Sequence, residues 1–190
     1  MRFGYTGWAK SRPSPRDSLR RSLGRMNELT ETRRALLESI AQEFLHNSWK
    51  GRRLLAVEGE TDELAARFAD DLAAVLTERG EPTVRVSLGD VDEPVLRAAT
   101  VEPFRAGELP DAENQDTVLV VDGRRLLNLS VRGIWHFSVW VLAGDELPHA
   151  SVNVVVDATD ESAPKRHFYD LCKLPPSIGE RTAAVGVTQP

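Results

Sequence analysis

The chain has 190 residues, of which 41% are hydrophobic and 28% are charged, which suits one well-buried α/β core but not two. No run of about 18 apolar residues is present, which excludes a membrane-spanning helix, and the single Cys172 excludes an internal disulfide, as is usual in a reducing cytoplasm. The net charge of -5 conceals two opposed parts, because residues 1–25 carry +6 and the remainder carries -11. So acidic a body argues against nucleic acid as its ligand.

Residues 1–28 mix serine, proline, glycine and arginine without a sustained hydrophobic period. We therefore expect a flexible basic arm, and no signal peptide. Such an arm is suited to nucleic acid, to an anionic membrane or to an acidic partner surface. Two other interpretations stay open: the arm lies on the acidic body of its own chain, or it is an upstream extension of a protein that starts at Met26.

Two amphipathic helices are predicted on either side of a first strand. Residues 30–49 carry apolar side chains at three- and four-residue spacing, and a threonine near the start is suited to cap this helix. Residues 54–57 then form a buried strand, followed by a tight turn at Gly59. A long helix over residues 62–79 follows, capped by Thr61 or Asp62 and ended by Gly80.

A strand, a glycine turn and a helix are the setting of the phosphate-binding Walker A loop, G-x-x-x-x-G-K-[ST], and that pattern can be laid on the chain from Gly59. The second glycine then falls on Leu64, the lysine on Ala65 and the hydroxyl residue on Ala66, so the chemistry that holds phosphate and magnesium is missing. Carboxylates stand in its place, on Glu60, Asp62 and Glu63. We expect the protein's own acids to fill the anion site; as an alternative, they only cap and complement the helix.

Further strands alternate with a helix along the rest of the chain. Strands are predicted over residues 83–87, 116–122, 137–143 and 152–156, with a short helix over residues 93–104 that is interrupted near Pro103. This alternation indicates right-handed crossovers and a parallel sheet covered on both faces. Residues 157–190 are expected to wrap the outside. The four histidines share no metal-ligand spacing, and no metal is expected.

Several segments together resemble a known family: RRLLAVEG, RFADDLAAVLTERGEPTVRVSLGD, VLVVDGRRLL with VRGIW, and VNVVVDATDESAP. In order and spacing they are similar to the actinobacterial uridine-kinase-like proteins, in the nucleoside and pantothenate kinase branch of P-loop NTPases. The resemblance implies a three-layer α/β sandwich with a five-stranded parallel sheet in the order 2-3-1-4-5. It also implies a domain over residues 29–166, with residues 167–190 as a C-terminal tail.

The family's functional positions are mostly lost. Its substrate-activating aspartate falls on Gly89, with Asp90 one position late, and both the substrate-binding insertion and the arginine-bearing lid are missing. Asp122 matches an acid that lies near metal and substrate in the family, although a lone acid at a strand end is more often a turn residue. The loop that lies beside the nucleotide base matches residues 157–164, and its candidate residues are Asp157, Thr159, Asp160 and Pro164.

These losses predict a cytoplasmic pseudokinase that binds a protein partner or a second copy of itself, through the strand ends or the basic arm, with no cofactor. One alternative is an ATP- and magnesium-dependent kinase that substitutes Arg124 and Arg125, or the arm's arginines, for the missing groups. Another is a sensor that binds a nucleoside or a metabolite. A third is a structural module in which basic arm and acidic body join copies head to tail.

Overall fold

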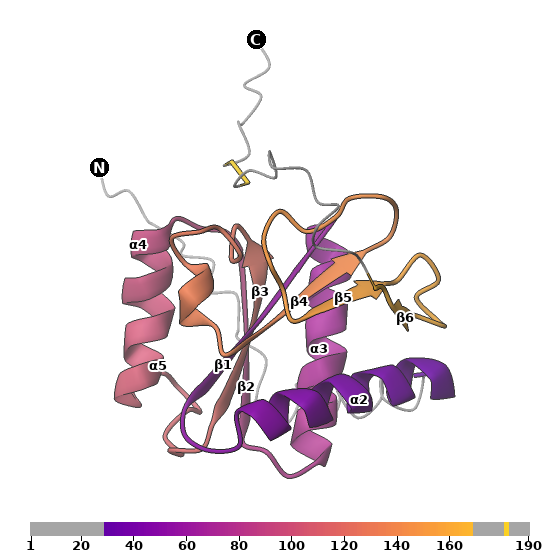
Figure 1. Ribbon diagram of the computed structural model, residues 1–190. Helices are drawn as coiled ribbons and strands as arrows, with labels where there is room; N and C mark the ends of the chain where they lie inside the picture. The colour runs from indigo at the N-terminus through magenta and orange to yellow at the C-terminus, as the bar shows by residue number, and fades with distance from the viewer. Residues whose placement is uncertain (1–28, 169–180, 183–190) are drawn as a thin grey trace, which may run out of the picture.

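The computed structural model describes residues 29–168 and 181–182 (Figure 1). The predicted arm and most of the predicted tail lie outside these residues. A central sheet runs in the order β2-β3-β1-β4-β5-β6. Its strands are β1 (Arg53–Gly59), β2 (Thr83–Asp90), β3 (Val118–Arg124), β4 (Phe137–Leu142), β5 (Val154–Asp157) and β6 (Lys165–Arg166).

The predicted strand order is confirmed, since β1 to β5 pair in parallel as 2-3-1-4-5. The predicted number of strands is wrong, because β6 adds a sixth, antiparallel strand beside β5. Its two residues pair with Val156 and Asp157 through backbone groups, and the N–H of His167 extends the ladder to the carbonyl of Val155 at 2.8 Å. Such a short polar segment has no hydrophobic period that could reveal it.

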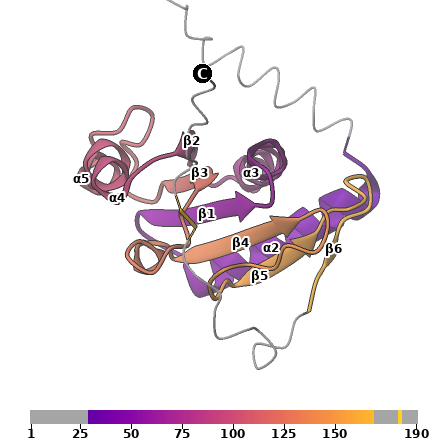
Figure 2. The same cartoon turned by 90° about the horizontal axis from the view of Figure 1, so that it is seen from above.

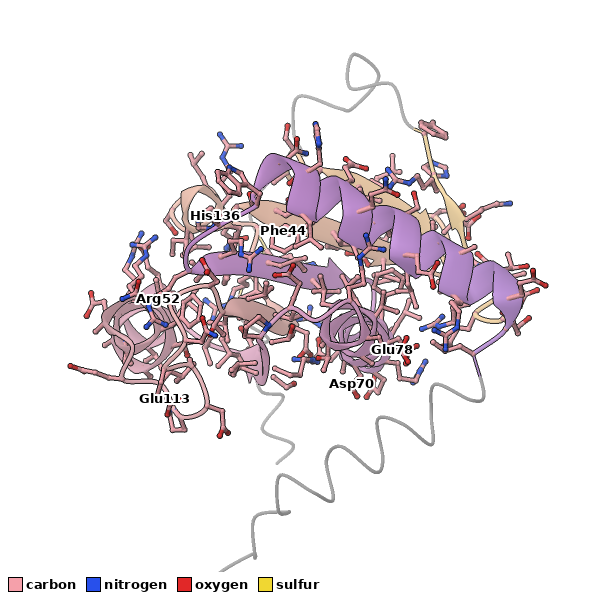
Figure 3. All side chains as sticks on the ribbon, turned by 90° about the horizontal axis from the view of Figure 1, so that it is seen from below. Phe44, Arg52, Asp70, Glu78, Glu113 and His136 are labelled. Carbon is pink, nitrogen blue, oxygen red and sulfur yellow. The ribbon has the colours of Figure 1, made fainter. Side chains whose placement is uncertain are left out.

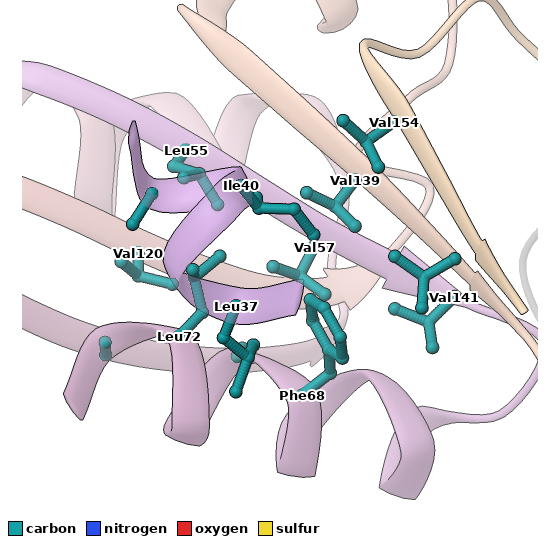
Figure 4. Packing of buried hydrophobic residues seen from close by; sticks show 14 of the residues in the cluster. Leu37, Ile40, Leu55, Val57, Phe68, Leu72, Val120, Val139, Val141 and Val154 are labelled. Carbon is teal, nitrogen blue, oxygen red and sulfur yellow. The ribbon is translucent and has the colours of Figure 1, made fainter. Parts of the chain in front are cut away.

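Helices α2 (Glu31–Asn47) and α3 (Asp62–Glu78) pack on one face of the sheet. Thr30 and Thr61 cap them, each accepting a hydrogen bond from a backbone N–H three residues on, as both sequences predict. Figure 4 shows the core between them, where Leu37 and Ile40 of α2 and Phe68 and Leu72 of α3 meet valines of β1, β3 and β4. All these side chains are buried, so this layer fixes α3 against the sheet.

The opposite face is covered by α4 (Glu93–Leu96), η1 (Arg97–Val101) and α5 (Glu102–Ala106), which follow one another without a break. In Figure 2, β2 and β3 lie between this segment and α3. The predicted interruption near Pro103 is confirmed in part, because the chain stays helical but its α-helical hydrogen bonding is interrupted just before the proline. A π-helical turn over η1 precedes the proline, and the N–H of Glu102 donates to the carbonyl of Arg97, which relieves the clash that a proline ring makes inside an α-helix.

The amino-terminal end of the sheet, seen in Figure 3, is held by polar contacts. The His136 ring accepts a hydrogen bond from the N–H of Leu54 at 3.0 Å, and the ring of Phe137 packs edge-on against Phe44. The buried Arg53 reaches Glu81 at 2.8 Å and three backbone carbonyls. These contacts leave the opposite, carboxyl end of the strands as the place where polar side chains of β1, β2 and β3 converge.

Among the described helices, none combines the length and the apolar character needed to cross a bilayer.

Candidate functional site at the carboxyl ends of the strands

Two residues, Glu60 and Thr61, connect β1 to α3. Gly59 is the last residue of β1 and not a turn as predicted, and a Cβ at this position would lie 2.8 Å from the carbonyl oxygen of Val141. The next N–H, of Glu60, donates to that same carbonyl at 2.9 Å. A Walker A loop places four residues between its glycines and points their N–H groups at phosphate. Here the chain turns into α3 too early to form that cradle.

This geometry places the residues of the predicted phosphate loop in different parts of the structure. Leu64, Ala65 and Ala66 all lie inside α3, and the first two are buried. Glu60 turns toward β4, where its carboxylate accepts a hydrogen bond from the N–H of Ala143 at 2.9 Å. Asp62 and Glu63 form the acidic first turn of α3, with Asp62 Oδ1 3.7 Å from Arg124 Nη1. The carboxylates therefore cap helix and strand ends.

Asp122 of β3, a predicted site residue, is buried and paired. It forms an ion pair with Arg85 of β2, and its second oxygen accepts a hydrogen bond from the Ser87 hydroxyl at 3.1 Å. Arg85 also lies 3.2 Å from Asp70 of α3. These contacts tie β2, β3 and α3 together and occupy the carboxylate that a metal or substrate would need.

Asp90 ends β2 and is paired with Arg125, whose Nε lies 2.5 Å from Asp90 Oδ1 and whose Nη1 lies 2.9 Å from Asp92 Oδ1. Arg125 has a left-handed backbone, with φ of 62°, which non-glycine residues seldom adopt. Hydrogen bonds from the side chain to both aspartates raise the pKa of the Arg125 guanidinium, although burial opposes them. The two arginines of the kinase alternative are thus already paired, Arg124 with Asp62 and Arg125 with two acids.

Glu58 of β1 lies at the centre of this edge, and the sequence reasoning missed it. Its side chain is fully buried and accepts hydrogen bonds from the N–H of Arg125 at 2.8 Å and of Leu127 at 3.0 Å. Burial raises the pKa of Glu58 to about 7, while the two N–H groups and the nearby Arg181 and Arg124 act in the opposite direction. The signal was a single acid at the end of the apolar strand RLLAVEG, since an acid in a buried strand needs partners.

Arg181 contacts the same edge from far along the sequence; in Figure 1 the described residues 181–182, in yellow, lie beyond the carboxyl ends of the strands. Its Nη2 lies 2.6 Å from Glu146 Oε1, its Nε lies 3.6 Å from Glu58 Oε1, and its guanidinium sits 4.7 Å from the ring centre of Trp140. The side chain of Asn128 donates a hydrogen bond to the carbonyl of Arg181 and accepts one from the N–H of Arg181, both at 3.0 Å. No local pattern around Arg181 predicts these contacts.

The predicted base-side loop, residues 157–164, binds to itself, to α2 and to α3, where Arg67 pairs with Glu161 at 2.7 Å. Asp157 accepts a hydrogen bond from the N–H of Thr159 at 3.0 Å, and Asp160 accepts one from the N–H of Ser162 at 2.9 Å. The bond from Thr159 lowers the pKa of Asp157, and a hydrogen bond from the Ser162 hydroxyl, together with that from its N–H, lowers the pKa of Asp160. Pro164 is buried. Thr30 at the start of α2 donates its hydroxyl to the carbonyl of Ser162. Beside the loop lies a shallow hollow of about 410 Å³ that includes Arg33, Arg67 and Asp71.

A metal centre is not formed within residues 29–168 and 181–182, where no three histidine, cysteine, aspartate or glutamate side chains are grouped to hold an ion.

Comparison with known proteins yields little. No family model matches the chain, and no curated protein matches it significantly. Among solved structures, the chain is similar to a proposed fructose transport system kinase from Silicibacter sp. TM1040, with 19% identity and a TM-score of 0.40. The match covers 60% of this chain and 75% of that chain. A likeness of this degree does not assign an activity to this chain.

Proposed function

We propose that this chain is a pseudoenzyme of the uridine-kinase-like type, which binds a protein partner at the carboxyl ends of its strands and does not transfer phosphate. The carrying observation is the two-residue connection between β1 and α3. A nucleotide's phosphates are held by a longer loop of backbone N–H groups, a lysine and a hydroxyl. This connection is too short for such a loop and has no lysine, and its one hydroxyl, that of Thr61, caps α3 by accepting a hydrogen bond from the N–H of Leu64.

The charges near the connection also support the proposal. Glu60, Asp62 and Glu63 lie in the connection and the first helical turn. A carboxylate about 5 Å from one phosphate charge opposes binding by roughly 3 kcal/mol at an effective dielectric of about 20. Binding in the micromolar range is worth only about 8 kcal/mol in total, so two such contacts are enough to prevent it.

The existing ion pairs weigh against the kinase alternative. Arg125 would have to leave Asp90 and Asp92, and Asp122 would have to leave Arg85 and Ser87, before either could serve phosphate or magnesium. Asp122 is buried, so breaking its pair with Arg85 costs about 3–5 kcal/mol, while the more exposed pairs of Arg125 contribute less. The sensor alternative meets a different obstacle, because Arg181 already occupies the strand ends beside Glu58.

Thermal unfolding of the full chain tests the proposal, with ATP, GTP or uridine, each with and without magnesium. A ligand at about 100 times its dissociation constant adds roughly 2.7 kcal/mol of stability, an upward shift of several degrees in Tm. We expect no shift beyond that seen with magnesium alone. A magnesium-dependent shift with ATP would overturn the proposal, and a shift with uridine that needs no magnesium would favour the sensor.

A further inference from the structure

The carboxyl edge of the sheet also contains a pocket that holds a guanidinium group. We call it the arginine pocket and define it by Glu58, Asn128, Trp140 and Glu146. Its present occupant is Arg181, whose side chain is only 9% exposed. The occupant meets carboxylates on two sides and an aromatic ring on its face. That combination is specific to arginine, because a planar guanidinium can stack on a ring and donate hydrogen bonds in its plane at once.

The pocket also forms hydrogen bonds with the backbone of its occupant. Asn128 donates from its side-chain amide to the carbonyl of Arg181 and accepts from the N–H of Arg181, both at 3.0 Å. An asparagine that satisfies both backbone groups of one residue acts as a strand would toward an added peptide. The site therefore fits an arginine within a polypeptide better than free arginine or another small cation.

The walls of the pocket are braced by the folded domain and not by Arg181. The Glu58 carboxylate is held by the N–H groups of Arg125 and Leu127, and the Trp140 indole donates to the carbonyl of Glu146 at 2.8 Å. The His149 ring also packs edge-on against Trp140, with ring centres 5.7 Å apart. Burial and the neighbouring Arg181 lower the pKa of His149 to about 4, so it stays neutral at physiological pH. A pocket built before its ligand arrives loses less freedom on binding.

We propose that the arginine pocket is a recognition site for an arginine carried on a polypeptide segment of a partner protein, and that Arg181 occupies it in cis when no partner is bound. This inference rests on the proposed function, because it names the ligand class of the same strand-end face. A residue tethered to the same chain competes at an effective concentration in the millimolar range. A partner segment consequently binds tightly only when it displaces Arg181 or when Arg181 is removed.

The test uses the full chain with Arg181→Ala and a fluorescent peptide of the sequence SIGERTAA, which reproduces residues 177–184. Fluorescence anisotropy is measured against this peptide and against versions with alanine or lysine in place of the arginine. We expect saturable binding of the arginine peptide, at least tenfold weaker binding of the lysine peptide, and none of the alanine peptide. The wild-type chain should bind the arginine peptide at least tenfold more weakly than the variant. Equal binding of the alanine peptide, or no binding by a variant that melts as the wild type does, would overturn the proposal.

A second measurement guards against a variant that fails to fold. Limited digestion with trypsin, followed by mass spectrometry, gives the rate of cleavage after Arg181 in the wild-type chain. Asn128→Ala and Glu146→Ala should each accelerate that cleavage at least tenfold, whereas Glu113→Ala, an exposed acid elsewhere on the molecule, should not. Unchanged rates in all three variants would show that Arg181 is not held.

The two proposals fail in different ways. Nucleotide titrations on the same preparations report on the pseudoenzyme proposal, since a magnesium-dependent ATP shift overturns it whatever the peptide does. Peptide anisotropy reports on the pocket alone.

Discussion

The carboxylate of Glu58 in β1 accepts a hydrogen bond from the backbone N–H of Leu127 at 3.0 Å, so a buried acid holds the loop that follows β3. Burial raises the pKa of Glu58 to about 7 and lowers that of His149 to about 4. The native chain therefore holds more protons at Glu58, and fewer at His149, than the unfolded chain does. Between pH 5 and 7 the Glu58 term makes stability fall with rising pH, and the His149 term makes it rise, each by about 2 kcal/mol.

These opposed terms predict opposite pH slopes in two variants. Glu58→Gln leaves the His149 term alone, together with a term of the same sign from His136, whose pKa burial also lowers; its stability should rise from pH 5 to 7. His149→Phe leaves the Glu58 term dominant, so its stability should fall over the same range. Urea denaturation at four pH values measures both. Parallel slopes in the two variants would contradict the assignment.

The ion pair between Arg33 and Asp71 predicts a large asymmetry between single and double variants. Both side chains are buried, with Nη2 of Arg33 2.7 Å from Asp71 Oδ2, and the guanidinium also donates to the carbonyl of Glu161. Arg33→Met alone leaves a buried, unpaired carboxylate and should cost about 3–5 kcal/mol. The double variant with Asp71→Leu should recover most of that loss. Equal stabilities of the single and double variants, in urea denaturation, would argue against a buried charge effect.

The close approach of β1 to β4 predicts that Gly59→Ala is destabilising. The added Cβ would meet the Val141 carbonyl at 2.8 Å, and relief by backbone movement should cost about 1–3 kcal/mol. Gly133→Ala is the matched control, because its Cβ would meet nothing within 4 Å and the change should stay within about 0.5 kcal/mol. Thermal unfolding of both variants gives the comparison, and similar Tm values would refute the contact.

Restoring the missing side chains should not restore nucleotide binding. In Ala65→Lys with Ala66→Ser, the lysine enters a position that is 1% exposed inside α3, so it should destabilise the fold by about 2 kcal/mol or more. The loop ahead of it remains two residues long. Isothermal titration with ATP and magnesium should detect no binding, with Ala66→Ser alone as the stability control. Micromolar affinity in the double variant would show that side chains, and not loop length, were the missing element.

The parts of the fold that obey a local period could be predicted. Helix α3 with its Thr61 cap follows from apolar spacing and is confirmed. The order of the five parallel strands was implied by the family resemblance, and it is confirmed as well. The interruption predicted near Pro103 takes the form of a π turn just before the proline and not of a break in the helix. Strand β6 was missed because backbone pairing alone defines it.

The candidate site could be predicted only in part. Asp90 and Asp122 were selected because they lie at or beside functional acids of the resembled family. They do lie at the carboxyl edge, but each is paired with an arginine that no spacing rule connects to it. Glu58 was passed over, although one acid in a buried strand is a visible signal. Arg181 lies 53 residues from Asn128, and contacts over such separations depend on tertiary structure. The functions assigned to the basic arm stay predictions, since residues 1–28 lie outside the described residues.

The two-residue strand β6 protects one edge of the sheet from pairing with another chain. An open sheet edge offers unpaired backbone groups that can seed aggregation with another chain, and nature blunts such edges with short, charged strands. β6 is short, and both its residues, Lys165 and Arg166, are basic. It covers β5, whose buried valines would make an adhesive border. The opposite border is β2, where Arg85 and Asp90 form ion pairs, so charged side chains stand at both edges of the sheet.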